Sequence, residues 1–157
     1  MSKFQIDLTL NAGQAIVSLE GVMDEDMVLE KVQGLNEETL IFDFDKVTSI
    51  NSCGIRDWIT FISSKATDSK IVYRKCPKVI IEQLNMVKGF LPEGAQIESF
   101  YAPFFCESCE NEEMVLLSPN HIKGRKAPTN LPCSQCKTEG IEFDALESQY
   151  FHFLPEA

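Results

Sequence analysis

The chain has 157 residues, 44% of them apolar, which fits one or two small globular domains. Its net charge of −10 argues against nonspecific binding to nucleic acid, because an acidic surface repels a polyanion. No apolar run approaches the roughly 18 residues that a membrane span requires, and the N-terminus has no basic region followed by an apolar block, so we expect a cytoplasmic protein.

The first 35 residues predict a β-hairpin followed by a short helix. Apolar and polar residues alternate over residues 4–10, and residues 15–20 return as a second strand after a turn at 11–14. We expect Asp24 to cap a short helix that carries Val28, Val32 and Leu35 on its buried face.

Residues 40–62 predict a strand, a polar turn and an amphipathic helix. The apolar run at 40–42 is typical of a strand that is buried on both faces. A turn of small residues at 51–54 follows it. The helix then repeats apolar residues at helical spacing, at Ile55, Trp58, Ile59 and Ile62. Ser52 lies at the N-terminus of this helix, where its hydroxyl suits a cap and where backbone N–H groups favour an anion.

The rest of the first two-thirds alternates strand and helix. Residues 70–74 predict a strand, and Pro77 suits the first turn of a helix that carries Ile80, Leu84 and Val87 and stops at Gly89. Residues 95–105 predict a final strand. The order β-β-α-β-α-β-α-β indicates an α/β fold with a mixed sheet covered by helices.

The segment 43–56 resembles the signature of STAS domains, the family of the bacterial anti-anti-sigma factors. The resemblance rests on Asp43-Phe44-Asp45, Val47 and the run Ile50-Asn51-Ser52-Cys53-Gly54-Ile55-Arg56, with the Gly21-x-x-Asp24 motif before it. It covers residues 1–103 and implies the STAS fold for that domain. Two positions depart from the pattern, because Asn51 stands where the family usually has Asp and Cys53 where it often has a second Ser or Thr.

The resemblance also implies a function in signal transduction. In that family the aligned serine, here Ser52, is phosphorylated by a partner kinase, and the unmodified surface binds that partner. The partner would be a GHKL-type serine kinase that acts as an anti-sigma factor, and a phosphatase would reset the switch. The implied partner surface comprises Asp24, Asn51, Ser52, Cys53, Gly54 and Arg56. A scaffold or docking module without phosphorylation is the alternative, and Asn51 favours it.

Residues 104–157 predict a second, small domain that resembles a zinc ribbon. Its two C-x-x-C pairs are Cys106 with Cys109 and Cys133 with Cys136, and 23 residues separate them. Two such pairs present four thiolates to one Zn²⁺, and the closed sphere makes the ion structural rather than catalytic. A short unit with few aliphatic residues also needs a metal for stability. A thiol redox sensor and an iron–sulfur site are the alternatives.

The remaining residues predict no enzyme. No phosphate loop, dinucleotide fingerprint or nucleophile elbow is present, and Cys53 and Cys76 suit packing roles. Residues 104–157 hold nine acidic and four basic side chains, which argues against a ribbon that binds nucleic acid. We expect the basic cluster at 123–126 to be a solvated loop. The aromatic tail at 141–154 should pack against the first domain or against a second copy, which would form a homodimer.

Overall fold

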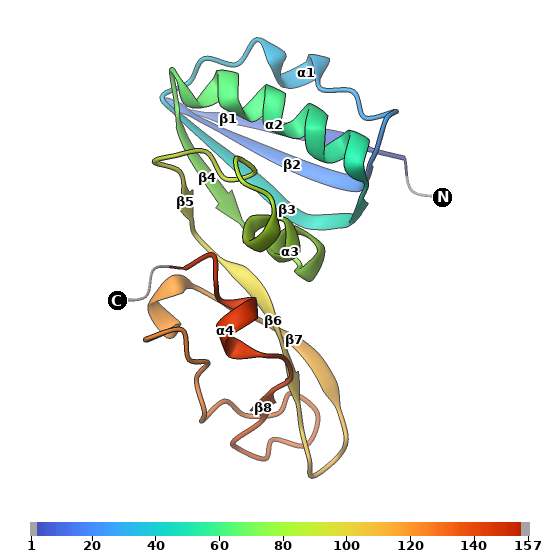
Figure 1. Ribbon diagram of the computed structural model, residues 1–157, viewed down its shortest axis with the longest axis vertical. Helices are drawn as coiled ribbons and strands as arrows, with labels where there is room; N and C mark the ends of the chain where they lie inside the picture. The colour runs from blue at the N-terminus through green and yellow to red at the C-terminus, as the bar shows by residue number, and fades with distance from the viewer. Residues whose placement is uncertain (1–2, 155–157) are drawn as a thin grey trace.

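The computed structural model of the chain describes residues 3–154 and has an α/β fold (Figure 1). Over this range it contains a five-stranded mixed sheet and a three-stranded antiparallel sheet. None of the helices in these residues is long and apolar enough to cross a membrane.

The five-stranded sheet has the order β1-β2-β3-β4-β5. The predicted hairpin is confirmed, because β1 (Gln5–Asn11) pairs antiparallel with β2 (Gln14–Met23). Three parallel strands follow, β3 (Thr39–Ile50), β4 (Lys70–Arg74) and β5 (Gln96–Ile97). The first eight elements therefore occur in the predicted order.

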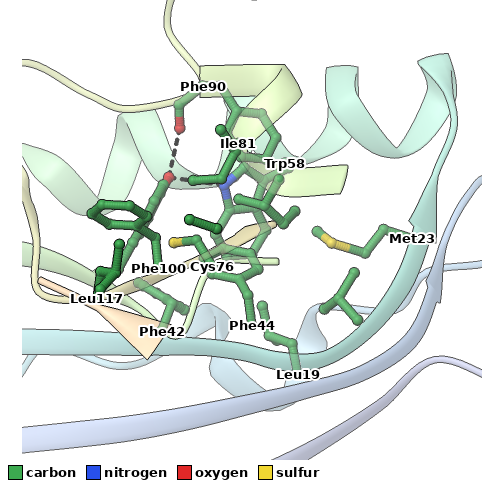
Figure 2. Packing of buried hydrophobic residues seen from close by; sticks show 14 of the residues in the cluster. Leu19, Met23, Phe42, Phe44, Trp58, Cys76, Ile81, Phe90, Phe100 and Leu117 are labelled. Atoms are coloured by element: carbon green, nitrogen blue, oxygen red, sulfur yellow. Dashed lines mark hydrogen bonds between the residues drawn. The ribbon is translucent and has the colours of Figure 1, made fainter. Parts of the chain in front are cut away.

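The helices of this part of the chain are α1 (Glu30–Gln33), α2 (Ser52–Ala66) and α3 (Lys78–Met86). The apolar face of α2 packs on Phe42 and Phe44 of β3 through Trp58, which is fully buried (Figure 2). The indole N–H of Trp58 donates to the Tyr73 hydroxyl at 3.0 Å, and that hydroxyl donates to the carbonyl of Phe90 at 2.6 Å. Both polar groups of this aromatic core are thus satisfied.

The stretch at 95–105 differs from the prediction, because it forms two strands in two sheets. After β5 the chain turns at Ser99, whose carbonyl accepts from the backbone N–H of Cys76 at 3.2 Å. It then continues as β6 (Phe100–Phe105), the central strand of the second sheet. The residues on both sides of the turn are apolar, so hydrophobic pattern alone does not mark the change of sheet. The expected domain boundary after residue 103 lies inside β6.

The second sheet has the order β7-β6-β8, with β7 at Glu112–Leu117 and β8 at Glu142–Phe143. A 3₁₀ turn (Pro119–His121) follows β7, and helix α4 (Glu147–Tyr150) follows β8. Strand β7 therefore lies between the two C-x-x-C pairs.

The aromatic tail packs inside the chain. Phe151 is fully buried and stacks on Phe143 with 4.9 Å between ring centroids, and it meets the edge of Phe100 at 6.1 Å. Asn85 of α3 donates to the carbonyl of Tyr150 at 2.9 Å. The tail therefore contacts both β6 and the helical layer of the first sheet, as expected from its composition.

Two details of the helices contradict the predictions. Asp24 does not cap a helix, because α1 begins only at Glu30 and Asp24 Oδ1 accepts from the backbone N–H of Asp26 at 2.9 Å in a turn. Val28 is 60% exposed in the segment between this turn and α1. Helix α3 ends at Met86 rather than at Gly89, since Val87 is already in an extended conformation.

Candidate functional site

Four cysteines converge at the far end of the second sheet. Cys106 follows β6, Cys109 precedes β7, and Cys133 and Cys136 lie in the long connection to β8. Their four Sγ atoms all lie within 4.8 Å of one another. The Sγ atoms of Cys106 and Cys136 are 3.6 Å apart, and those of Cys109 and Cys133 are also 3.6 Å apart. The sequence-predicted metal ligands are thus brought together, and they can hold one metal ion.

These distances fit a tetrahedral metal ion and not a pair of disulfides. A disulfide joins its sulfurs at about 2.05 Å. Four sulfurs at about 2.3 Å from a central Zn²⁺ lie about 3.8 Å from one another, close to the separations in this cluster. The chemistry of the donor set, four thiols and no carboxylate, favours a soft or borderline cation.

The two C-x-x-C segments are built in the same way. The backbone N–H of Glu110 donates to the carbonyl of Cys106 at 2.8 Å, and that of Lys137 donates to Cys133 at 3.0 Å. The N–H groups of Cys106 and Cys133 each donate to a carbonyl five residues on, both at 2.9 Å. In each segment the first cysteine is buried and the second is exposed. Two copies of one tight turn therefore face each other across the cluster.

Each turn requires a left-handed residue directly after its second cysteine. Glu110 has φ of 62° and Lys137 has φ of 67°. Glycine adopts this conformation without a steric penalty. Here two residues that carry side chains adopt it instead.

Polar groups beside Cys133 and Cys136 favour their thiolates, whereas the pKa of Cys109 is raised to about 12, because its hydrogen bond with the Asn111 backbone is outweighed by desolvation and the neighbouring sulfurs. Hydrogen bonds with the side chain and then the backbone of Thr138, whose Oγ1 lies 3.2 Å from Cys136 Sγ, lower the pKa of Cys136 to about 6. The backbone N–H groups of Cys136 and Gln135 lower the pKa of Cys133. Glu113 ties β7 to the second turn by accepting from the backbone N–H of Ser134 at 3.2 Å. Sequence reasoning missed Thr138 and Glu113, because only the fold places them beside the turn.

The N-terminus of α2 is the second candidate site, and Asn51 caps it. Asn51 Oδ1 accepts from the backbone N–H of Gly54 at 2.9 Å, with Asn51 itself in an extended conformation. The expectation that Ser52 caps the helix is wrong, since Ser52 is already the first helical residue. Among residues 3–154 the exposed Ser52 hydroxyl has no hydrogen-bond partner.

Gly54 explains how this helix end meets the sheet. A Cβ at this position would lie 2.0 Å from the carbonyl oxygen of Met23, at the end of β2. The backbone N–H of Asn51 donates to the same carbonyl at 3.1 Å. Helix α2 therefore begins in direct backbone contact with β2, which places the turn at Asp24 beside Asn51 and Gly54.

The surroundings of this helix end are acidic. Asn51 Nδ2 donates to Glu25 Oε2 at 2.9 Å, and this hydrogen bond, followed by one to its own backbone, lowers the pKa of Glu25. Glu25 lies between Asp24 and Asp26 in the turn after β2. Sequence reasoning missed its role, although the acidic run Asp24-Glu25-Asp26 was a visible signal.

The remaining residues singled out in the sequence lie outside the metal cluster. Two of them, Cys53 and Arg56, lie in the first turns of α2. Arg56 lies one turn along α2, largely exposed, with its Nε 3.4 Å from Asp57 Oδ1. Cys53 is half-buried in the first turn. Cys76 is fully buried, and burial raises the pKa of its thiol, which suits a packing role. Within the basic cluster, Lys123 and Lys126 are exposed as expected of a solvated loop, whereas Arg125 donates to the carbonyls of His152 and Leu154.

Compared with the known protein families and with curated proteins, the sequence shows no match to either.

Proposed function

We propose that this protein is a non-catalytic, STAS-like regulator that binds a protein partner through the N-terminus of α2 and is switched by phosphorylation of Ser52. One observation carries the proposal. Ser52 is an exposed residue in the first turn of a helix that is capped by its neighbour Asn51, so its hydroxyl takes no part in holding the helix. A kinase can modify this hydroxyl without unfolding the site.

The order of strands and helices supports the comparison with STAS domains. A hairpin followed by alternating parallel strands and helices is the arrangement that the resemblance implies, and the motif residues 51–54 join β3 to α2. The motif residue Asp24 lies beside them, because Gly54 allows α2 to start against the end of β2. Asn51 and Ser52 are exposed at this helix end, whereas Gly54 is buried and would support the surface rather than form part of it.

The switch would act through charge. A phosphate adds about −1.5 to −2 charges at neutral pH. On Ser52 this charge would join Asp24, Glu25 and Asp26 on a surface where Arg56 is the nearby cation. A partner surface that is itself acidic, such as one around a bound nucleotide, would be repelled. By resemblance the partner is a GHKL-type serine kinase that acts as an anti-sigma factor, and a phosphatase reverses the modification.

For the second unit we propose one structural Zn²⁺ on Cys106, Cys109, Cys133 and Cys136. Four thiolates complete a tetrahedral sphere and leave no position for a substrate. The ion would hold the long connection before β8 against the end of β6, and so keep the second sheet closed. The proposed role is stability and not chemistry.

The proposal is tested by affinity capture of binding partners from the native cell, with Ser52→Asp and Ser52→Ala compared as bait. Ser63→Asp is the matched control, since Ser63 is an exposed serine further along the same helix. We expect Ser52→Asp to lose a serine kinase of this class, while Ser52→Ala and Ser63→Asp retain it, and phosphate should be found on Ser52. Equal binding by all variants, with no phosphate on Ser52, would rule out the switch.

A second candidate is a docking module that is never phosphorylated. The hydrogen bond between Asn51 and Glu25 favours it, because this pair departs from the family pattern and gives the helix end a fixed acidic surface. In that case Ser52→Asp adds one more charge to an acidic surface, and partner binding should change little. The phosphate analysis of Ser52 separates the two candidates.

A further inference from the structure

We propose that the chain forms a twofold dimer in which β7 pairs antiparallel with β7 of a second copy. In the sheet order β7-β6-β8, strand β7 has a neighbour on one side only. All six residues are in register with β6, so alternate residues of β7 direct their backbone N–H and C=O groups to the other edge, where no strand of the described chain pairs with them. An open strand edge of this kind is a template for another strand.

The edge strands β1 and β7 differ in the groups that would oppose pairing with another strand. Strand β1, at the edge of the five-stranded sheet, carries Asp7, and the Lys31 ammonium donates to the carbonyl of Ile6 at 3.0 Å. Charges and a bound lysine discourage pairing at such an edge. Strand β7 has no charge in its last four residues, and its outward side chains Met114 and Leu116 are 45% and 43% exposed.

Apolar neighbours on β6 extend this surface. Met114 lies opposite Pro103 and Leu116 lies opposite Tyr101 in the register of the two strands. Pro103 and Tyr101 are themselves only half-buried. A strand added to the free edge of β7 would cover Met114 and Leu116 from the other side and continue the same apolar face.

Symmetry limits the register of such a pair. A twofold axis perpendicular to the sheet preserves its faces, so residues that face each other across the new pair must come from the same face of β7. With the axis at Val115, Val115 faces Val115 of the second copy and Met114 faces Leu116, while Glu113 faces Leu117 and Glu112 faces Ser118. No carboxylate then opposes another.

Other symmetric registers fit less well. An axis at Glu113 sets the two copies of Glu113 against each other, and like charges directly opposite are destabilising. An axis at Met114 sets Glu112 against Leu116 and Glu113 against Val115. An axis at Leu116 sets the exposed Met114 against Ser118. Only the register centred on Val115 sets the exposed apolar Met114 and Leu116 of each copy against each other with no carboxylates opposed, and this self-complementary pattern favours a second copy over an unrelated strand as the occupant.

Sedimentation of the whole chain and of its variants tests this register. We expect the unsubstituted protein to dimerise. Met114→Lys and Leu116→Glu should each weaken self-association about tenfold or more, because two apolar pairs are lost and a charge faces an apolar side chain. The double variant should dimerise again, since each introduced lysine then faces an introduced glutamate of the other copy, and its dimer should weaken with salt. Met86→Lys, at an exposed apolar residue of α3, is the matched control and should remain dimeric.

Cross-linking gives a second readout that does not depend on charge. Val115→Cys places a thiol on the axis, where the Cα atoms of facing residues are about 4.5–5.5 Å apart, within the range of a disulfide. Oxidised glutathione should convert this variant to a covalent dimer, and Met114→Cys should not respond. A monomeric unsubstituted chain, a dimer that Leu116→Glu leaves intact, or a double variant that stays monomeric would each overturn the proposal.

Discussion

Asn51 uses both ends of its side-chain amide, with Oδ1 accepting from Gly54 and Nδ2 donating to Glu25 Oε2, each at 2.9 Å. One residue thus caps helix α2 and joins it to the turn after β2. An aspartate could accept from Gly54 but could not donate to Glu25, and two carboxylates would then be in contact. The asparagine is therefore matched to its acidic neighbour.

The first prediction concerns the cap. Asn51→Ala should lower the free energy of unfolding by about 1 kcal/mol, because the N–H of Gly54 loses its acceptor. Ser52→Ala should change it by less than about 0.5 kcal/mol, since the hydroxyl makes no hydrogen bond within the described chain. Chemical denaturation of both variants measures the difference. A larger loss for Ser52→Ala than for Asn51→Ala would show that the serine is the cap after all.

The second prediction concerns the pKa of Glu25. The hydrogen bond from Asn51 is the largest cause that lowers this pKa from its ordinary value of 4.5. Because the folded-state pKa is depressed, the interaction stabilises the fold above the unfolded pKa, and this contribution is lost as the pH falls through the folded value. Asn51→Ala should raise the pKa of Glu25, and its stability deficit should narrow in acid.

Titration of the Glu25 side-chain carboxyl by NMR checks this directly. Asn120→Ala, at an exposed asparagine of the second unit, serves as the control and should leave the Glu25 pKa in place. An unchanged Glu25 pKa in Asn51→Ala would mean that the two side chains do not interact in solution.

The third prediction concerns Gly54. Gly54→Ala should cost about 3 kcal/mol and reduce partner binding, because the new methyl group would meet the Met23 carbonyl and force α2 away from β2. Gly34→Ala is the matched control, since nothing lies within 4 Å of a Cβ there and its φ is negative. Thermal melts of the two variants should differ clearly, and equal melting temperatures would contradict the close approach.

Much of the fold could be predicted because most elements have a plain hydrophobic period. The hairpin, the α2 stripe and β4 follow from local pattern. The two-sheet division of residues 95–105 could not, because Ile97 and Phe100 are apolar on both sides of the turn and only tertiary hydrogen bonds at Ser99 separate the strands. The hydrophobic pattern of a segment indicates that it is buried. It does not indicate which strand or sheet the segment packs against.

The sites show the same limit. Spacing alone predicted which cysteines converge, since a C-x-x-C pair is a local structure. The cap was assigned to Ser52 rather than Asn51, because both residue types suit the position and a shift of one residue decides it. The contact of Asn51 with Glu25 joins residues 26 apart in the chain, and nothing local indicates it.

The fourth prediction concerns the metal. The purified protein should contain one zinc per chain, and Co²⁺ in its place should give the absorption of a four-thiolate site. Cys133→Ser should lose the metal and become sensitive to protease between residues 106 and 140, while Cys53→Ser should keep full metal content because Cys53 lies outside the cluster. A metal-free chain with a protease-resistant second unit would contradict the assignment.

The last prediction uses the left-handed residues of the two cysteine turns. Glu110→Gly should raise the free energy of unfolding by about 0.5–1 kcal/mol, because glycine adopts φ near 62° without strain. Lys137→Gly should gain less, since the Lys137 ammonium donates to the Ser134 carbonyl at 2.9 Å and that bond is lost. Glu107→Gly, in the same turn as Glu110 but without a positive φ, is the control and should be destabilising by a similar amount. Denaturation of the metal-loaded protein measures all three, and a loss of stability in Glu110→Gly would show that the turn does not hold this conformation.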